Sequence, residues 1–190
     1  MRRLILVRHA GTRAVRSACF APEDALDAQG RRAAAALREV LPRADEALAG
    51  PCLAAFQTTS LAGFAPVRIE PALADCDYGR WSGRPLGDVE RDEPDAVAEW
   101  LTNPDATPHG GESVRDLLAR IAAWLDTQSS RSGTVIAVTP GAVVRAAVVG
   151  ALAAPASAFW RIDVAPAGVT ELHCRDGRWT VTKVNERVAV

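Results

Sequence analysis

The feature that most constrains the fold of this chain is a short aliphatic run that leads directly into charged residues. Residues 4–7 read Leu-Ile-Leu-Val, and Arg8, His9, Ala10 and Gly11 follow at once. Four consecutive aliphatic residues are typical of a strand that is buried on both faces, as in a parallel sheet covered by helices. Ligands of open α/β sheets bind at the carboxyl ends of the strands. We therefore expect Arg8 and His9 to reach a ligand site.

A second stretch repeats this pattern. Residues 134–139 form another aliphatic run, Pro140 and Gly141 follow, and residues 142–153 favour a helix. Proline is favoured at the first position of a helix, and Thr139 is a fair cap before it. Two strand-turn-helix units predict an α/β fold whose central strands are parallel and end side by side. The helix that starts at Gly141 then points backbone N–H groups at the ligand site.

Most of the remaining chain divides into helices and strands. Asp27 is placed to cap an alanine-rich helix that Pro42 stops, and Ser113 is placed to cap a later helix. Further helices are expected over residues 52–61 and 93–101, and strands over residues 46–49, 67–70, 169–174 and 179–184, with a hairpin turn at Asp176 and Gly177. Loops are expected over residues 13–22, 71–86 and 103–111.

Length, charge and cysteine content limit the classes of function. A chain of 190 residues is long enough for one compact core and short for two, so we expect a single domain over residues 1–190. The formal net charge of −1 provides no basic field, which argues against nucleic acid and anionic membranes as partners. The four cysteines are widely spaced and no motif has metal-ligand spacing, so we expect reduced, mostly packed thiols and neither a metal nor another cofactor.

The cellular location and the oligomeric state are inferred from the hydrophobic segments and from the candidate surface residues. The apolar run after Met1 is too short for an export signal, and no later segment is long enough to span a membrane. We therefore expect a cytoplasmic protein. Exposed tryptophans and the C-terminal hairpin would permit a homodimer.

Arg8 and His9 together suit an anionic ligand. A guanidinium offers planar, bidentate donors to phosphate or carboxylate, and an imidazole can act as nucleophile, acid or donor. Arg13 and Arg16 in the following loop are expected to lie near the same site, although arginines in loops are mostly solvated surface residues. The alternative for the Arg8-His9 pair is a strand that simply ends in two solvated polar residues.

The motif at Arg8 and His9 resembles the Arg-His-Gly signature of the histidine phosphatase superfamily, which includes cofactor-dependent phosphoglycerate mutases, fructose bisphosphatases, α-ribazole phosphatases and phytases. Ala10 stands where that signature usually has glycine. The resemblance runs through nearly the whole chain and is strongest to the phosphoglycerate mutase-like and α-ribazole phosphatase-like branch. It implies a three-layer α/β sandwich with a mostly parallel central sheet flanked by helices.

The resemblance also implies a role for individual residues. In this family the histidine attacks a phosphoryl group, so His9 is the expected nucleophile and Arg8 an expected donor to the phosphoryl oxygens. Residues 73–83 resemble the loop in which a glutamate precedes the first glycine by four residues, and Asp75 stands at that place. Asp75 is therefore the expected acid for the leaving oxygen, on a side chain one methylene shorter than glutamate. Thr12 and, at the start of its helix, Gly141 are further expected anion-binding residues.

Two positions of the family's phosphate bracket are substituted. Ala54 replaces the second arginine, and Pro140 replaces the second histidine. Removing one preorganised donor costs about 10²- to 10³-fold in rate, so losing two is expected to cost about 10⁴- to 10⁶-fold unless other groups replace them. Arg13, Arg16 and His109 are the candidates for that replacement, although a solvated surface position is as common a place for each.

Three functions remain open from the sequence. The first is a histidine-phosphatase-like phosphomonoester hydrolase that acts on a small phosphorylated metabolite through phospho-His9, with a weakened site. The second is a repurposed enzyme of the same fold that acts on an anionic, non-phosphoryl substrate. The third is a non-catalytic anion-binding module. Each of them takes a small anionic ligand.

Overall fold

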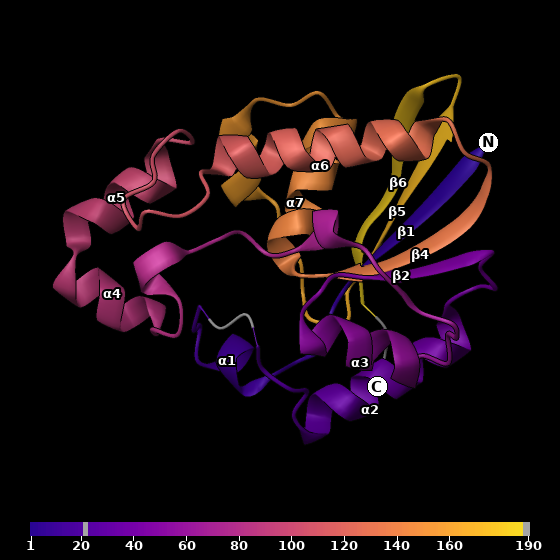
Figure 1. Ribbon diagram of the computed structural model, residues 1–190, viewed down its shortest axis with the longest axis horizontal. Coiled ribbons are helices and arrows are strands. Elements are labelled where there is room, and N and C mark those ends of the chain that lie inside the picture. The colour runs from indigo at the N-terminus through magenta and orange to yellow at the C-terminus, as the bar shows by residue number, and fades with distance from the viewer. Residues whose placement is uncertain (21–22, 188–190) are drawn as a thin grey trace.

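The sheet of this protein has six strands in the order β3-β2-β4-β1-β5-β6, as seen in a computed structural model that describes residues 1–20 and 23–187 (Figure 1). The central strands β1 and β4 are parallel, and Arg8 at the end of β1 lies opposite Thr139 at the end of β4. β2 and β3 extend the parallel part, whereas β5 and β6 add an antiparallel hairpin. The strands span Arg2–Arg8 (β1), Glu46–Ala49 (β2), Arg68–Ile69 (β3), Gly133–Thr139 (β4), Val169–Arg175 (β5) and Arg178–Glu186 (β6).

The aliphatic run of β1 is buried on both faces, as its composition predicts. Successive side chains of a strand point to opposite faces of the sheet. Leu4 and Leu6 accordingly join one hydrophobic core, and Ile5 and Val7 join the other. The two cores fix β1 in the middle of the molecule, so the residues that follow it emerge at a rigid edge.

Helices cover both faces of the sheet. Figure 1 shows α2 and α3 on one side and α6 and α7 on the other, which gives the three-layer α/β sandwich expected from the sequence. Helices α4 and α5 lie apart from the sheet (Figure 1). The helices span Arg13–Arg16 (α1), Ala28–Val40 (α2), Leu53–Leu61 (α3), Leu86–Asp92 (α4), Pro94–Thr102 (α5), Val114–Ser129 (α6) and Gly141–Ala151 (α7).

The predicted helix caps are confirmed at α2 and α6 but not at α7. Asp27 Oδ1 accepts a hydrogen bond from Gly30 N at 2.7 Å, and Ser113 Oγ accepts one from Asp116 N at 3.0 Å. At α7, Pro140 is itself the cap residue rather than the first helical residue. The Thr139 hydroxyl instead donates to the Leu73 carbonyl at 3.0 Å. The prediction that Thr139 caps this helix is therefore wrong, because its side chain holds a neighbouring loop.

One short helix lies where a loop was expected, and a second begins at the end of another expected loop. α1 forms within residues 13–22, where the Thr12 hydroxyl accepts from Val15 N at 3.1 Å. α4 begins at the end of the region 71–86, and its few apolar side chains pack only against a small cluster around Trp81 and Trp100. Both segments are short and have few apolar residues, so their sequence shows no helical periodicity from which a helix could be predicted.

The expectation of exposed tryptophans is wrong. Trp81, Trp100 and Trp124 are buried, and Trp160 and Trp179 are partly buried against the core. All four cysteines are free thiols, and all but Cys19 are buried. No helix within residues 1–20 and 23–187 combines the length and the apolar character that crossing a membrane requires.

Candidate active site

A pocket of about 150 Å³ opens where β1 and β4 end. Its walls come from segments that are distant in sequence: the end of β1, the turn into α1, the start of α3, the loop after β3, and the first turns of α7. The predicted residues Arg8, His9, Thr12, Asp75 and Gly141 all line it. The other lining residues are Val15, Asp24, Cys52, Ala54, Tyr78, Pro140, Ala142 and Arg145.

His9 is held so that one ring nitrogen faces the backbone. Its amide donates to the Thr139 carbonyl at 2.9 Å, which fixes the residue to the end of β4. Its Nδ1 lies 2.9 Å from the Ala10 carbonyl oxygen. Because a carbonyl can only accept, we assign the ring proton to Nδ1. Nε2 then carries the lone pair, and it has no hydrogen-bond partner in the part of the chain that the structure describes.

The environment of His9 keeps its ring neutral. Burial lowers the pKa of His9 to about 4, and the nearby charge of Arg8 adds to this effect. The imidazole is consequently unprotonated at neutral pH. A neutral imidazole with an unpaired Nε2 is the form that can attack an electrophile.

Arg8 is a half-buried cation whose Nε lacks a hydrogen-bond partner within residues 1–20 and 23–187. Its Nη1 donates to the Val164 carbonyl at 2.6 Å, whereas its buried Nε has no hydrogen-bond partner among the described residues. Burial, followed by the charge of Arg145, lowers the pKa of Arg8. Gly141 packs so closely here that a Cβ on it would lie 3.1 Å from Arg8 Nε. Glycine at 141 thus lets the start of α7 approach the guanidinium.

The loop that carries Asp75 is clamped to the body of the protein by Arg120. Its Nη1 donates to the Ala72 carbonyl at 2.6 Å and to the Ala74 carbonyl at 3.0 Å, and its Nη2 pairs with Glu112 at 2.7 Å. Gly79 has a positive φ of 46°, and a Cβ there would collide with the His109 carbonyl. These contacts give the loop a fixed position over the pocket.

Asp75 has the surroundings of a proton donor. Its Oδ1 accepts from Cys76 N at 2.9 Å and from the Tyr78 hydroxyl at 3.4 Å. Burial nevertheless raises its pKa to about 6. A carboxyl that titrates near neutral pH can deliver a proton and take one back.

The two substituted bracket positions also face the pocket. Ala54 lies in the first turn of α3, and Pro140 caps α7. Neither side chain can donate a hydrogen bond. This wall is therefore apolar where the resemblance to the family leads us to expect an arginine and a histidine.

Three residues proposed as replacements lie outside the pocket. Arg13 is exposed, and Arg16 pairs with Asp27, its Nη2 lying 3.1 Å from Oδ1. His109 is buried against the Trp81 ring, with centroids 5.0 Å apart, and its Nδ1 accepts from Gly111 N. Arg16 and His109 are held by local partners that sequence spacing does not reveal. None of the three supplies the missing donors in this structure.

Arg145 lines the pocket, although sequence reasoning did not select it. It follows Gly141 by four residues, so both lie on the same face of α7. This four-residue spacing, visible in the sequence, indicates that Arg145 faces the same side as Gly141. The pocket residue Cys52, in contrast, has its pKa raised to about 11 by burial, so it is a neutral thiol at neutral pH. Within the described ranges, no three His, Cys, Asp or Glu side chains group as a metal site would require.

Fold and pocket define an α/β protein with an arginine and a histidine at the carboxyl end of a central strand, β1. The family model described as "Histidine phosphatase superfamily (branch 1)" matches residues 4–187. The chain belongs to this family, which confirms the resemblance seen at Arg8 and His9.

The matches to curated relatives cover only part of each relative's length. Phosphoserine phosphatase 1 of Hydrogenobacter thermophilus is 26% identical over 119 residues, which are 61% of this chain and 56% of the relative. A bifunctional protein of Mycobacterium tuberculosis is 27% identical over 124 residues, which are 63% of this chain and 34% of the relative. The chain thus spans between a third and somewhat over half of these relatives.

Solved structures share the fold over the whole chain. A mycobacterial glucosyl-3-phosphoglycerate phosphatase in complex with VO3 superposes with a TM-score of 0.88 at 24% identity, covering 98% of this chain and all of the other. The α-ribazole phosphatase of Shigella flexneri gives a TM-score of 0.87 at 21% identity, covering 99% and 98%.

We expect inorganic phosphate to raise the melting temperature of the protein. Arg8 and the first N–H groups of α7 border the pocket, and such groups favour an anion. Ligand at 100 times its Kd stabilises a fold by about 2.7 kcal/mol. Scanning fluorimetry in phosphate, against potassium chloride of equal ionic strength, measures the shift. Equal melting temperatures in both salts would contradict an anion site.

Proposed function

We propose that this protein is a phosphomonoester hydrolase that acts on a small phosphorylated metabolite through a phosphohistidine at His9. The observation that carries the proposal is the meeting of two complementary groups in one pocket. His9 is neutral and has an unpaired Nε2, while Asp75 is a half-buried carboxyl whose pKa is raised to about 6. A nucleophile and a proton donor are what the cleavage of a phosphate ester needs.

In the first step His9 Nε2 attacks phosphorus and the ester P–O bond breaks. Asp75 gives its proton to the departing oxygen, which leaves as an alcohol. The ring becomes cationic when Nε2 is phosphorylated, and its Nδ1 proton continues to face the Ala10 carbonyl at 2.9 Å. That carbonyl dipole favours the charge as it develops.

In the second step water attacks the phosphohistidine. The Asp75 carboxylate accepts a proton from the water, the P–N bond breaks, and inorganic phosphate leaves. Both residues return to their starting protonation states, so the cycle balances without another reactant.

The charge on the transferring group is met by Arg8 and the start of α7. With Ala54 and Pro140 in place of two donors, the rate is expected to be low relative to family members with a complete bracket. Phosphate-monoester hydrolysis is so slow without a catalyst that a weakened site still accelerates it measurably.

The proposed mechanism predicts an acidic optimum of kcat/KM between about pH 4 and 6. Below the first value His9 gains a proton and cannot attack, and above the second Asp75 loses the proton that it must donate. On an alkyl phosphate we expect Asp75→Asn to lower kcat/KM at pH 5 by about 100-fold. Steady-state rates from pH 3.5 to 8 for both proteins test this.

The Asn variant also identifies the origin of the alkaline limb. A phosphate monoester itself ionises near pH 6. A limb caused by Asp75 disappears in Asp75→Asn, whereas one caused by the substrate persists. An unchanged profile and rate in the variant would remove Asp75 from the mechanism.

A second candidate is an enzyme of the same fold that acts on an anionic substrate without phosphoryl transfer. It is favoured by the apolar wall at Ala54 and Pro140, which offers no donor to phosphoryl oxygens. A wild-type protein that binds phosphate but turns over no phosphate ester would support this candidate or a non-catalytic anion-binding role.

A further inference from the structure

We propose that Arg145 is the second phosphate-binding cation of the pocket and takes over the function of the donors missing at Ala54 and Pro140. The effect of Arg145 on the rate of turnover rests on the function proposed above. Phosphate binding itself needs no turnover, so the two ideas can fail separately.

The position of Arg145 on α7 directs it to the pocket. Gly141 begins the helix and Arg145 lies four residues later, so the two residues occupy the same face. Side chains of an α-helix lean toward its N-terminus. The guanidinium therefore extends back toward the end of β4, and both residues line the pocket.

The guanidinium is held in place by groups that leave its outer nitrogens free. Nε donates to the Ile162 carbonyl at 2.9 Å. The guanidinium carbon lies 5.8 Å from the Phe159 ring centroid and 5.7 Å from that of Trp160, within the range of cation–π attraction. Neither Nη atom has a hydrogen-bond partner in the described parts of the chain. This leaves two nitrogens for the oxygens of an anion.

The pocket brings two cations together without neutralising either. Among the described residues, neither Arg8 nor Arg145 forms an ion pair with a carboxylate. Asp24 and Asp75 also line the pocket, but Asp24 is engaged by Ala14 N at 2.7 Å and Asp75 by Cys76 N. Burial and then the charge of Arg145 lower the pKa of Arg8, as repulsion between two guanidinium groups predicts. A dianion between them would relieve that repulsion.

A purely structural role for Arg145 makes a different prediction. Its bond to Ile162 and its packing on the aromatic rings hold the segment Ala156–Arg161 against α7. A residue with only that role would affect stability and leave phosphate affinity unchanged.

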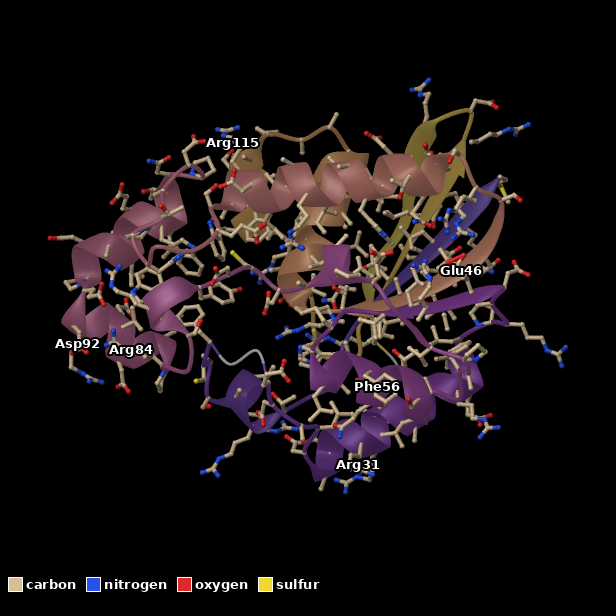
Figure 2. The ribbon with its side chains drawn as sticks, in the orientation of Figure 1. Arg31, Glu46, Phe56, Arg84, Asp92 and Arg115 are labelled. Carbon is tan, nitrogen blue, oxygen red and sulfur yellow. The ribbon has the colours of Figure 1, made fainter. Side chains whose placement is uncertain are left out.

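Titration calorimetry with inorganic phosphate tests the proposal without any substrate. The variants are Arg145→Gln, Arg145→Lys and, as the matched control, Arg31→Gln. Arg31 is an exposed arginine on α2, and Figure 2 shows it at the outer surface of that helix, away from α7. We expect Arg145→Gln to weaken binding by about 10- to 100-fold, as for a lost charge-assisted hydrogen bond. Arg145→Lys should be intermediate and Arg31→Gln should match the wild type.

A measurement on the unaltered protein covers the case in which Arg145→Gln folds poorly. Phenylglyoxal modifies arginine side chains, and peptide mass spectrometry locates the modified residues. We expect phosphate to slow the modification of Arg145 and to leave that of Arg31 unchanged.

Three results would overturn the proposal: no phosphate binding by the wild type, wild-type affinity in a folded Arg145→Gln protein, or equal modification of Arg145 with and without phosphate. Phosphate binding that depends on Arg145 in a protein without phosphatase activity would overturn the proposed function alone.

Discussion

His9→Ala is expected to abolish phosphate-ester turnover, with a loss of at least about 10³-fold in kcat. His9 is the one residue of the pocket that combines a neutral nucleophilic nitrogen with a position at the end of β1. Alanine leaves Arg8 and the start of α7 in place, so phosphate affinity should fall far less than the rate. Hydrolysis of p-nitrophenyl phosphate measures the loss, because its good leaving group reduces the need for an acid.

The matched control for this experiment is His173→Ala. His173 lies on β5, outside the pocket, with its Nε2 2.6 Å from Glu171 Oε1. It should retain wild-type turnover. Rapid quenching in alkaline denaturant during turnover, followed by phosphoramidate detection at His9, tests the covalent intermediate directly, because the P–N bond of phosphohistidine breaks in acid. Equal turnover by His9→Ala and the wild type would exclude the phosphohistidine mechanism.

Ala54→Arg combined with Pro140→His is expected to raise phosphatase activity by at least tenfold. Each restored donor is worth about 10²- to 10³-fold in rate, so the upper limit is the product of the two effects. Both positions line the pocket, so side chains introduced there can reach a phosphoryl group bound in it. If Arg145 already supplies one of the missing contacts, the gain falls below that product. The kcat/KM of the double variant, each single variant and the wild type measures how the two changes combine.

The fold should tolerate these changes. Pro140 is a cap residue with an extended backbone, φ −61° and ψ 158°, which histidine can also adopt. Losing the proline constraint should cost at most about 1 kcal/mol of unfolding free energy. Ala54→Gln with Pro140→Ala serves as a control without the cationic and imidazole groups. A flat rate in a folded Arg-His variant would favour the second candidate, in which the vacated space belongs to another substrate.

The features that could be predicted from the sequence are those that depend on residues close together in the chain. The aliphatic character of β1 and β4 identifies the centre of the sheet, and Asp27 marks the start of α2 through a hydrogen bond only three residues long in sequence. The end of β1 then places Arg8 and His9 in a pocket. The family motif adds Asp75, and the structure places this residue in the same pocket.

The rest depends on tertiary partners that spacing cannot reveal. Arg16 is captured by Asp27, and His109 is enclosed by Trp81 and Trp100. Arg145 sits in an otherwise apolar helix, where it reads as a surface residue. Only the packing of α7 over the end of β1 turns its face toward the pocket.

The order of the strands has a consequence for how the protein is made. Both neighbours of β1 are encoded late in the chain, because β4 begins at Gly133 and β5 at Val169. On a ribosome that adds 5–20 residues per second, the apolar strand that carries His9 waits on the order of ten seconds for its first partner. Throughout that time its edges are open to other chains. The same central position that holds His9 in the finished site therefore leaves β1 without a partner strand for most of synthesis.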